Sequence, residues 1–133
     1  MVGEKILVVE DEEITVEDLM DTLELLGYEV VAAVPSGEEA ILKAREYSPD
    51  LVLMDIELAG EMDGIMSAKQ IKEENDIPIL FLTAYSDEKT IEKLKEVEPE
   101  GYMLKEPFHL IYKPFKEDEL RSVLEITLHK YKK

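Results

Sequence analysis

Five short apolar runs, separated by segments of helical periodicity, are the feature that most constrains the fold of this chain. The first run, Lys5-Ile6-Leu7-Val8-Val9, is almost continuously apolar and lacks the alternating polar residues of a strand with one exposed face. Such a run is typical of a strand buried on both faces, as in parallel sheets. Similar runs cover residues 30–34, 51–54 and 79–82, and one or two further candidates lie between residues 102 and 112.

Between these runs, apolar side chains recur at the spacing of amphipathic helices. Gly27 is suited to end the first helix, and Ser36 with Glu39 forms the pattern of a capping box at the start of the second. Alternating strands and helices predict a doubly wound α/β fold, with a five-stranded parallel sheet and helices on both faces. The predicted inward-facing residues of the five helices are Ile14, Leu19, Met20, Leu23 and Leu26; Ala40, Ile41 and Ala44; Ile65, Ala68 and Ile71; Ile91 and Leu94; and Leu120, Val123, Leu124 and Leu128.

Length and charge exclude several classes of function. The chain has 133 residues, which suits one domain over residues 1–133. It carries 15 Lys and Arg against 32 Asp and Glu, a net charge of −17, which disfavours nucleic acid and anionic membranes as partners. No apolar run approaches the roughly 18 residues of a membrane span, no secretory signal is visible, and cysteine is absent. We therefore expect a cytoplasmic protein without membrane insertion.

Acidic side chains follow two of the predicted strands at the points where ligands bind in open α/β sheets. Glu10 and Asp11 follow the first run, Asp55 follows the third and Thr83 follows the fourth. If the first and third strands are neighbours, three carboxylates converge, and a hard cation such as Mg²⁺ would offset their repulsion. A carboxylate can also attack phosphorus and form an acyl phosphate. Each residue alone is common in turns and at helix N-termini, but their joint placement favours a site.

These residues and their surroundings resemble the receiver domain of two-component response regulators, over essentially the whole chain. The resemblance implies a flavodoxin-like sheet with strand order 2-1-3-4-5. The motifs that carry it are Ile6-Leu7-Val8-Val9-Glu10-Asp11-Glu12, Pro49-Asp50-Leu51-Val52-Leu53-Met54-Asp55-Ile56, Met62-Asp63-Gly64, Pro78-Ile79-Leu80-Phe81-Leu82-Thr83-Ala84 and Lys113-Pro114-Phe115.

The resemblance also implies a role for each site residue. Asp55 would accept a phosphoryl group from the phosphohistidine of a sensor histidine kinase or a phosphotransfer protein. Asp11 would bind Mg²⁺ directly, Glu10 would join through water, and the backbone carbonyl of Glu57 would complete the protein ligands. Thr83 and a lysine would bind the phosphoryl oxygens, and Gly64 would serve the turn after the acidic loop. Glu10 stands where the family more often has aspartate.

Two lysines compete for the phosphate-binding role, because residues 98–105 and 106–113 read as a tandem duplication of eight residues with Glu, Pro and Lys at the same offsets. Lys105 lies 22 residues after Thr83 (105 − 83), the usual spacing in the family, and Tyr102 occupies the position of its switch aromatic. Lys113 carries the Lys-Pro-Phe motif and leads directly into the last helix. We favour Lys113 and keep Lys105 as the alternative.

The expected function is that of a stand-alone, phospho-accepting signalling switch, monomeric or weakly dimeric, that acts on an unknown downstream protein. It would catalyse its own phosphorylation and dephosphorylation without being an enzyme in the usual sense. One alternative is a Mg²⁺-dependent phosphohydrolase with an aspartyl nucleophile. Such enzymes usually carry a second aspartate two residues after the nucleophile, and the pair follows the first strand. In this chain the second position is Glu57, and Asp55 follows the third predicted strand. The other alternative is a pseudo-receiver that serves only as an interaction module.

Overall fold

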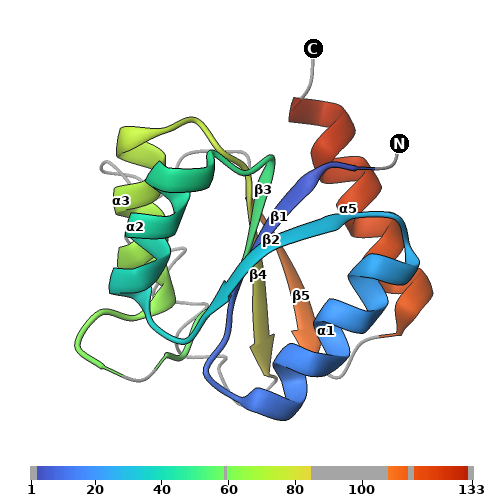
Figure 1. Ribbon diagram of the computed structural model, residues 1–133, viewed down its shortest axis with the longest axis horizontal. Coiled ribbons are helices and arrows are strands. Elements are labelled where there is room, and N and C mark those ends of the chain that lie inside the picture. Colours follow the sequence, from blue (N-terminus) through green and yellow to red (C-terminus); the bar gives the residue numbers. More distant parts are fainter. Residues whose placement is uncertain (1–2, 59, 85–107, 114–115, 132–133) are drawn as a thin grey trace.

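A five-stranded parallel sheet forms the centre of the protein (Figure 1). The structure is a computed structural model, and it describes residues 3–58, 60–84, 108–113 and 116–131. The strands are β1 (Lys5–Val9), β2 (Glu29–Val34), β3 (Leu51–Asp55), β4 (Ile79–Ala84) and β5 (Phe108–Lys113). Their order across the sheet is β2-β1-β3-β4-β5 and every neighbouring pair is parallel. The predicted fold class and strand order are confirmed.

Helices cover both faces of this sheet (Figure 1). Helices α1 (Glu13–Leu25) and α5 (Glu117–Tyr131) pack on one face, and α2 (Gly37–Tyr47) and α3 (Gly64–Glu74) pack on the other. The predicted helix with Ile91 and Leu94 lies outside the described residues. No helix in the described ranges has the length and apolarity that a bilayer crossing requires.

The two-sided burial of β1 explains its continuous apolar sequence. Ile6 and Val8 face the core shared with α1 and α5, whereas Leu7 and Val9 face the core shared with α2 and α3. Since successive side chains of a strand point to opposite faces, no position of β1 in this range can be polar without entering one of the cores. The same argument holds for Leu51–Met54 of β3, whose side chains are completely buried.

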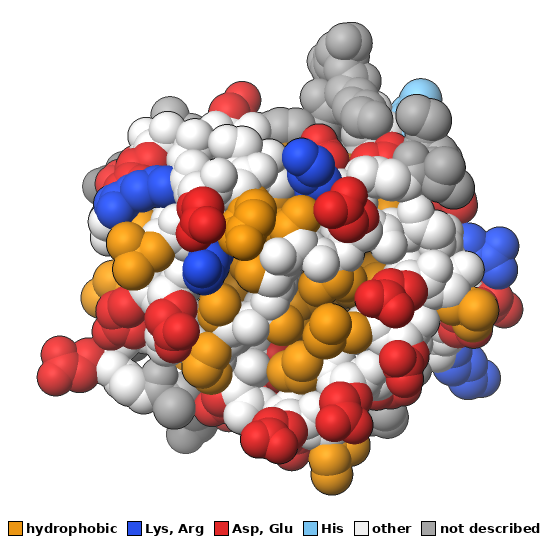
Figure 2. Space-filling view, in the orientation of Figure 1, with side chains coloured by type: hydrophobic (Ala, Val, Ile, Leu, Met, Phe, Trp, Pro, Cys, Tyr) orange, Lys and Arg blue, Asp and Glu red, His pale blue; other side chains and the backbone are white. Residues whose placement is uncertain are grey.

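Strand β2 differs because it lies at one edge of the sheet. Residues 30–32 are only partly buried and Ala33 is exposed, so the predicted two-sided burial of this strand is only partly correct. Figure 2 shows hydrophobic side chains at the surface in the middle of the view, where β2 crosses the molecule in Figure 1. An edge strand has one neighbour and incomplete cover, which its apolar sequence does not reveal.

Helix α1 ends at the predicted glycine, but its first predicted inward-facing residue is exposed. Gly27 adopts φ of +97°, and the N–H groups of Gly27 and Tyr28 donate to the carbonyls of Glu24 and Leu23 at 3.0 Å each, which is a Schellman motif. The prediction that Ile14 faces inward is wrong, since its side chain is 80% exposed. At 3.6 residues per turn, a residue five positions before the buried Leu19 is rotated about 140° away from it.

Helices α2 and α3 begin with side-chain caps. The Ser36 hydroxyl accepts from the Glu39 N–H at 3.2 Å, as the capping box predicts, and donates to the Glu39 carboxylate at 3.1 Å. Asp63 accepts from the Met66 N–H at 2.9 Å. These caps satisfy backbone donors that have no partner within a helix. The predicted inward residues of α2 and α3 are all buried, as are Leu120, Leu124 and Leu128 of α5.

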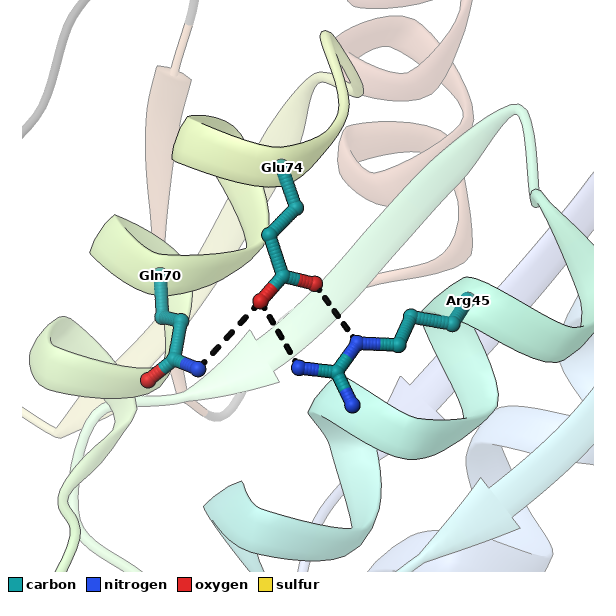
Figure 3. A network of polar contacts seen from close by, with 3 residues as sticks. All are labelled: Arg45, Gln70 and Glu74. Atoms are coloured by element: carbon teal, nitrogen blue, oxygen red, sulfur yellow. Dashed lines mark hydrogen bonds and ion pairs between the residues drawn. The ribbon is translucent and has the colours of Figure 1, made fainter.

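A polar network joins α2 to α3 on the outside of the sheet (Figure 3). The Arg45 guanidinium donates to both carboxylate oxygens of Glu74, at 2.7 and 2.8 Å, and the Gln70 amide donates to Glu74 at 3.3 Å. The hydrogen bonds from Arg45 and then Gln70 lower the pKa of Glu74 to about 2. A bidentate ion pair of this kind fixes the relative orientation of the two side chains better than a single contact does. Because the pair is exposed, it contributes little to the stability of the protein.

This ion pair predicts a pH-dependent contribution to stability. Because the pKa of Glu74 is lower in the folded state, the contribution is complete above the unfolded value and is lost as pH falls towards about 2. Glu74→Gln is therefore expected to unfold at a slightly lower temperature than the parent at neutral pH, with the difference shrinking as the solution is acidified below about pH 4. Thermal unfolding across this range, with exposed Glu73→Gln as the control, measures it. A difference that grows on acidification would contradict the pairing.

Candidate functional site

The carboxyl ends of β1 and β3 meet because the two strands are direct neighbours, with Val9 opposite Met54. Glu10 and Asp11 leave the end of β1, and Asp55 is the last residue of β3. The three side chains each offer a carboxylate oxygen, and these oxygens all lie within 4.8 Å of one another. Glu10 and Asp55 are buried, at 2% and 5% exposure, whereas Asp11 is exposed. We call these three residues the acidic triad.

Backbone hydrogen bonds orient two members of the acidic triad. The Glu12 N–H donates to Oε2 of Glu10 at 3.2 Å, and the Glu57 N–H donates to Oδ1 of Asp55 at 3.1 Å. The sheet ladder also continues past β1 and β3, since the Glu10 N–H donates to the carbonyl of Val34 at 3.0 Å and the Ile56 N–H donates to that of Leu82 at 3.1 Å. The carboxylates are therefore held by short connections to a rigid sheet.

Gly64 fixes the path of the chain after Asp55 by close contact. Its N–H donates to the Ile56 carbonyl at 2.9 Å. A Cβ atom on Gly64 would collide with the carbonyl oxygen of Asp55 and would lie 2.9 Å from Cα of Ile56. Glycine is therefore required here by the approach of α3 to the site, and its φ is not in the left-handed region that turns use.

The ends of β4 and β5 complete the edge of the sheet that carries the acidic triad. Asp55 lies opposite Leu82 of β4, so Thr83 stands one residue further along, and Lys113 is the last residue of β5, opposite Ala84. The second of the two repeated segments, which carries Lys113, forms β5. Lys105 and Tyr102 of the first segment lie outside the described residues.

The donor chemistry of the acidic triad fits Mg²⁺. Mg²⁺ binds oxygen ligands at about 2.0–2.1 Å, so oxygens on opposite sides of one ion stand roughly 4.2 Å apart. This separation falls within the 4.8 Å that bounds the distances between the triad oxygens. Within the described residues the cluster offers only carboxylate oxygens, which suit hard cations such as Mg²⁺. The exposed Glu57 lies beside the triad through its N–H contact with Asp55.

Comparison with known proteins identifies the family. A family model described as the response regulator receiver domain matches residues 6–125. The chain belongs to the response regulator receiver domain family. The receiver domain is 30% identical over 131 residues to the transcriptional regulatory protein PdtaR of Mycobacterium tuberculosis, which covers 98% of this chain and 60% of that protein. It is 35% identical over 103 residues to the polar-differentiation response regulator DivK of Brucella ovis, covering 75% of this chain and 82% of DivK.

Solved structures give the same family. The signal receiver domain of a modulated diguanylate cyclase from Desulfovibrio desulfuricans matches with a TM-score of 0.83 and 34% identity, over 96% of this chain and 95% of that one. The receiver domain of a sensor histidine kinase from Pseudomonas aeruginosa matches with a TM-score of 0.79 and 28% identity, over 96% and 99% of the chains, and that structure has magnesium coordinated in its active site cleft. The chain spans 34% to 60% of the length of PdtaR and of several other regulators that it matches.

Much of the site follows from the sequence, and the structure adds what the sequence lacked. The predicted convergence of Glu10, Asp11 and Asp55 is confirmed. The backbone donors at Glu12 and Glu57 and the close packing of Gly64 were not predicted in these roles.

Proposed function

We propose that this receiver domain accepts a phosphoryl group on Asp55 in a Mg²⁺-dependent reaction and thereby switches the binding of another protein. The observation that carries the proposal is the approach of the Glu10, Asp11 and Asp55 carboxylate oxygens to within 4.8 Å at the ends of two neighbouring strands. Such a cluster is costly without a cation. Bound Mg²⁺ would neutralise charge on the acidic triad and on the incoming phosphoryl group.

The position of Asp55 supports its role as the acceptor. It lies at the end of β3, between the acidic residues that follow β1 and Thr83 near the end of β4. An oxygen of its carboxylate attacks phosphorus, the bond from phosphorus to the donor imidazole nitrogen breaks, and that nitrogen leaves with the electron pair. The Glu57 N–H, 3.1 Å from Oδ1, holds the carboxylate in one orientation during this displacement.

The remaining residues divide between the cation and the phosphoryl group. Asp11, Glu10 and the carbonyl of Glu57 would hold Mg²⁺. Thr83 and Lys113 would bind phosphoryl oxygens, the first as a hydroxyl donor and the second as a point charge. Phosphorylation adds about −1.5 to −2 charges at this end of the sheet. The added charge biases the connections that follow β4 and β5, and a downstream partner reads the change.

The proposal is tested by incubating the protein with acetyl phosphate, with and without Mg²⁺. The intact mass is expected to rise by one phosphoryl group per chain when Mg²⁺ is present and to stay unchanged when it is chelated. Absence of any incorporation together with absence of Mg²⁺ binding would instead favour a pseudo-receiver. Repeated turnover of p-nitrophenyl phosphate would favour a phosphohydrolase.

The assignment of Lys113 predicts a difference between two alanine variants. Lys113 ends β5 at the same edge of the sheet as Thr83, so Lys113→Ala is expected to slow phosphorylation by roughly a hundredfold and to reduce the conformational response. Lys105→Ala serves as the matched control and is expected to behave like the parent. NMR shift changes on adding Mg²⁺ and beryllofluoride measure the response. The opposite ranking of the two variants would assign the role to Lys105.

A further inference from the structure

A second surface lies along the outer edge of β2 and adjoins the acidic triad at the carboxyl end of that strand. Within the part of the chain that the structure describes, no strand pairs with this edge. Residues 30–34 carry no charge, and most of them are at least partly exposed. Natural edge strands are usually guarded by charged residues, proline or a bulge. Strand β2 has one of these features, a bulge at Val31, because its pairing with β1 shifts between Ile6 and Leu7. Pro35 lies beyond the end of the strand and does not interrupt the edge.

A groove of about 390 Å³ opens at the carboxyl end of this strand, between β2 and α1. Its walls divide into two kinds of side chain. Four residues are apolar and four are carboxylates. The apolar residues are Val16, Ala33, Val34 and Pro35, and the carboxylates are Glu10, Asp11, Glu13 and Glu17. We call this space the α1–β2 groove.

The charge around the α1–β2 groove is uniformly negative on the α1 side. Helix α1 carries Glu and Asp at five positions and has no Lys or Arg. Within the described residues, neither Glu13 nor Glu17 forms an ion pair. Figure 2 shows acidic side chains along the border formed by α1, beside the hydrophobic side chains over β2. A second copy of a chain with net charge −17 would be repelled from this surface, whereas a cation would be attracted.

We propose that the α1–β2 groove and the adjoining edge of β2 bind an extended basic segment of a partner protein. A lysine or arginine of that segment lays its aliphatic stem on Val16 and Pro35 and directs its charge to Glu13 and Glu17. Apolar residues of the segment cover the exposed edge of β2. The inference goes beyond the phospho-accepting role and does not depend on it. Glu10 and Asp11 belong to both the groove and the acidic triad, but the carboxylates that receive the cation, Glu13 and Glu17, lie outside the triad.

The test is an NMR titration of the isotope-labelled protein, without Mg²⁺, using a six-residue peptide of alternating valine and lysine. Saturable shifts are expected at residues 13–17 and 30–35. The double variant Glu13→Gln/Glu17→Gln is expected to weaken binding by roughly fivefold. The matched control Asp21→Asn/Glu24→Gln removes the same charge from the same helix outside the groove and is expected to bind like the parent. The spectrum of each variant reports its folding.

Several outcomes would overturn the inference. One is the absence of saturable shifts, and another is an equal loss of affinity in both double variants, which would indicate attraction by the net charge alone. Equal binding of a peptide with glutamate in place of lysine would exclude a basic occupant. Shifts at residues 30–35 that depend on protein concentration without peptide would assign this edge to a second copy. Because Mg²⁺ and phosphoryl donors are absent, none of these outcomes bears on the role of Asp55.

Discussion

Asp55→Asn is expected to abolish phosphorylation by acetyl phosphate, with the rate falling by roughly a thousandfold or more. The amide has nearly the same shape as the carboxylate but lacks the negatively charged oxygen that attacks phosphorus. Its carbonyl oxygen can still accept the Glu57 N–H that now reaches Oδ1 at 3.1 Å. The loss is therefore expected in a folded protein, and incorporation followed by mass spectrometry measures it.

The control for Asp55→Asn is Asp18→Asn, the same change at an exposed position of α1. This variant is expected to take up the phosphoryl group at the parental rate. If Asp55→Asn were phosphorylated as fast as the parent, Asp55 would not be the acceptor and the assignment would fail. If both variants were slow, the general charge of the surface would be responsible.

Asp11→Asn is expected to weaken Mg²⁺ binding by roughly 10- to 100-fold, because it removes one charged ligand from a cluster that a divalent cation would bridge. It should also raise the unfolding temperature of the Mg²⁺-free protein, since three carboxylates within 4.8 Å repel one another when no cation is present. The parent should gain about 2.7 kcal/mol of stability when Mg²⁺ is at 100 times its dissociation constant. The variant at the same concentration should gain much less.

Calorimetric titration and thermal unfolding with and without Mg²⁺ measure these effects. Glu13→Gln is the matched control, because it removes the same charge two residues further along the chain and outside the acidic triad. It is expected to keep the parental response to Mg²⁺. An equal response to Mg²⁺ in Asp11→Asn and the parent would show that the triad does not hold the cation.

The fold is predictable from the sequence where burial is two-sided. The bounds predicted for β1 are those of the structure because Ile6–Val9 alternate between two cores, so each of these four positions must be apolar. Prediction is weaker where cover is incomplete. The edge strand β2 has the apolar sequence of a buried strand, and Ile14 has the residue type but not the angular position of the inward face of α1. Neither exposure can be inferred from residue type alone.

The acidic triad was predictable for a related reason. In a parallel sheet the carboxyl ends of neighbouring strands meet at one edge, so residues 45 positions apart, Glu10 and Asp55, come together once β1 and β3 are paired (55 − 10 = 45). The contact of Gly64 with the backbone at Asp55 was not predictable, because it depends on the path of the loop between them. Residue spacing contains no information about that path.

The last strand shows where local sequence is insufficient. Residues 98–105 and 106–113 are similar enough that either apolar stretch fits a strand by composition. The structure pairs Phe108–Lys113 with β4 along its full length, from Ile79 to Ala84. Pairing with β4 is a property of the folded sheet, and the composition of a segment does not contain it.

The most direct test of the central claim is to identify the phosphorylated residue chemically. Protein phosphorylated with acetyl phosphate and Mg²⁺ is reduced with borohydride, which converts an aspartyl phosphate to homoserine, and its peptides are then sequenced by mass spectrometry. Homoserine is expected at position 55 and at no other position. Reduction at Glu10 or Asp11, or the absence of any reduced residue in a protein that carries phosphate, would contradict the account.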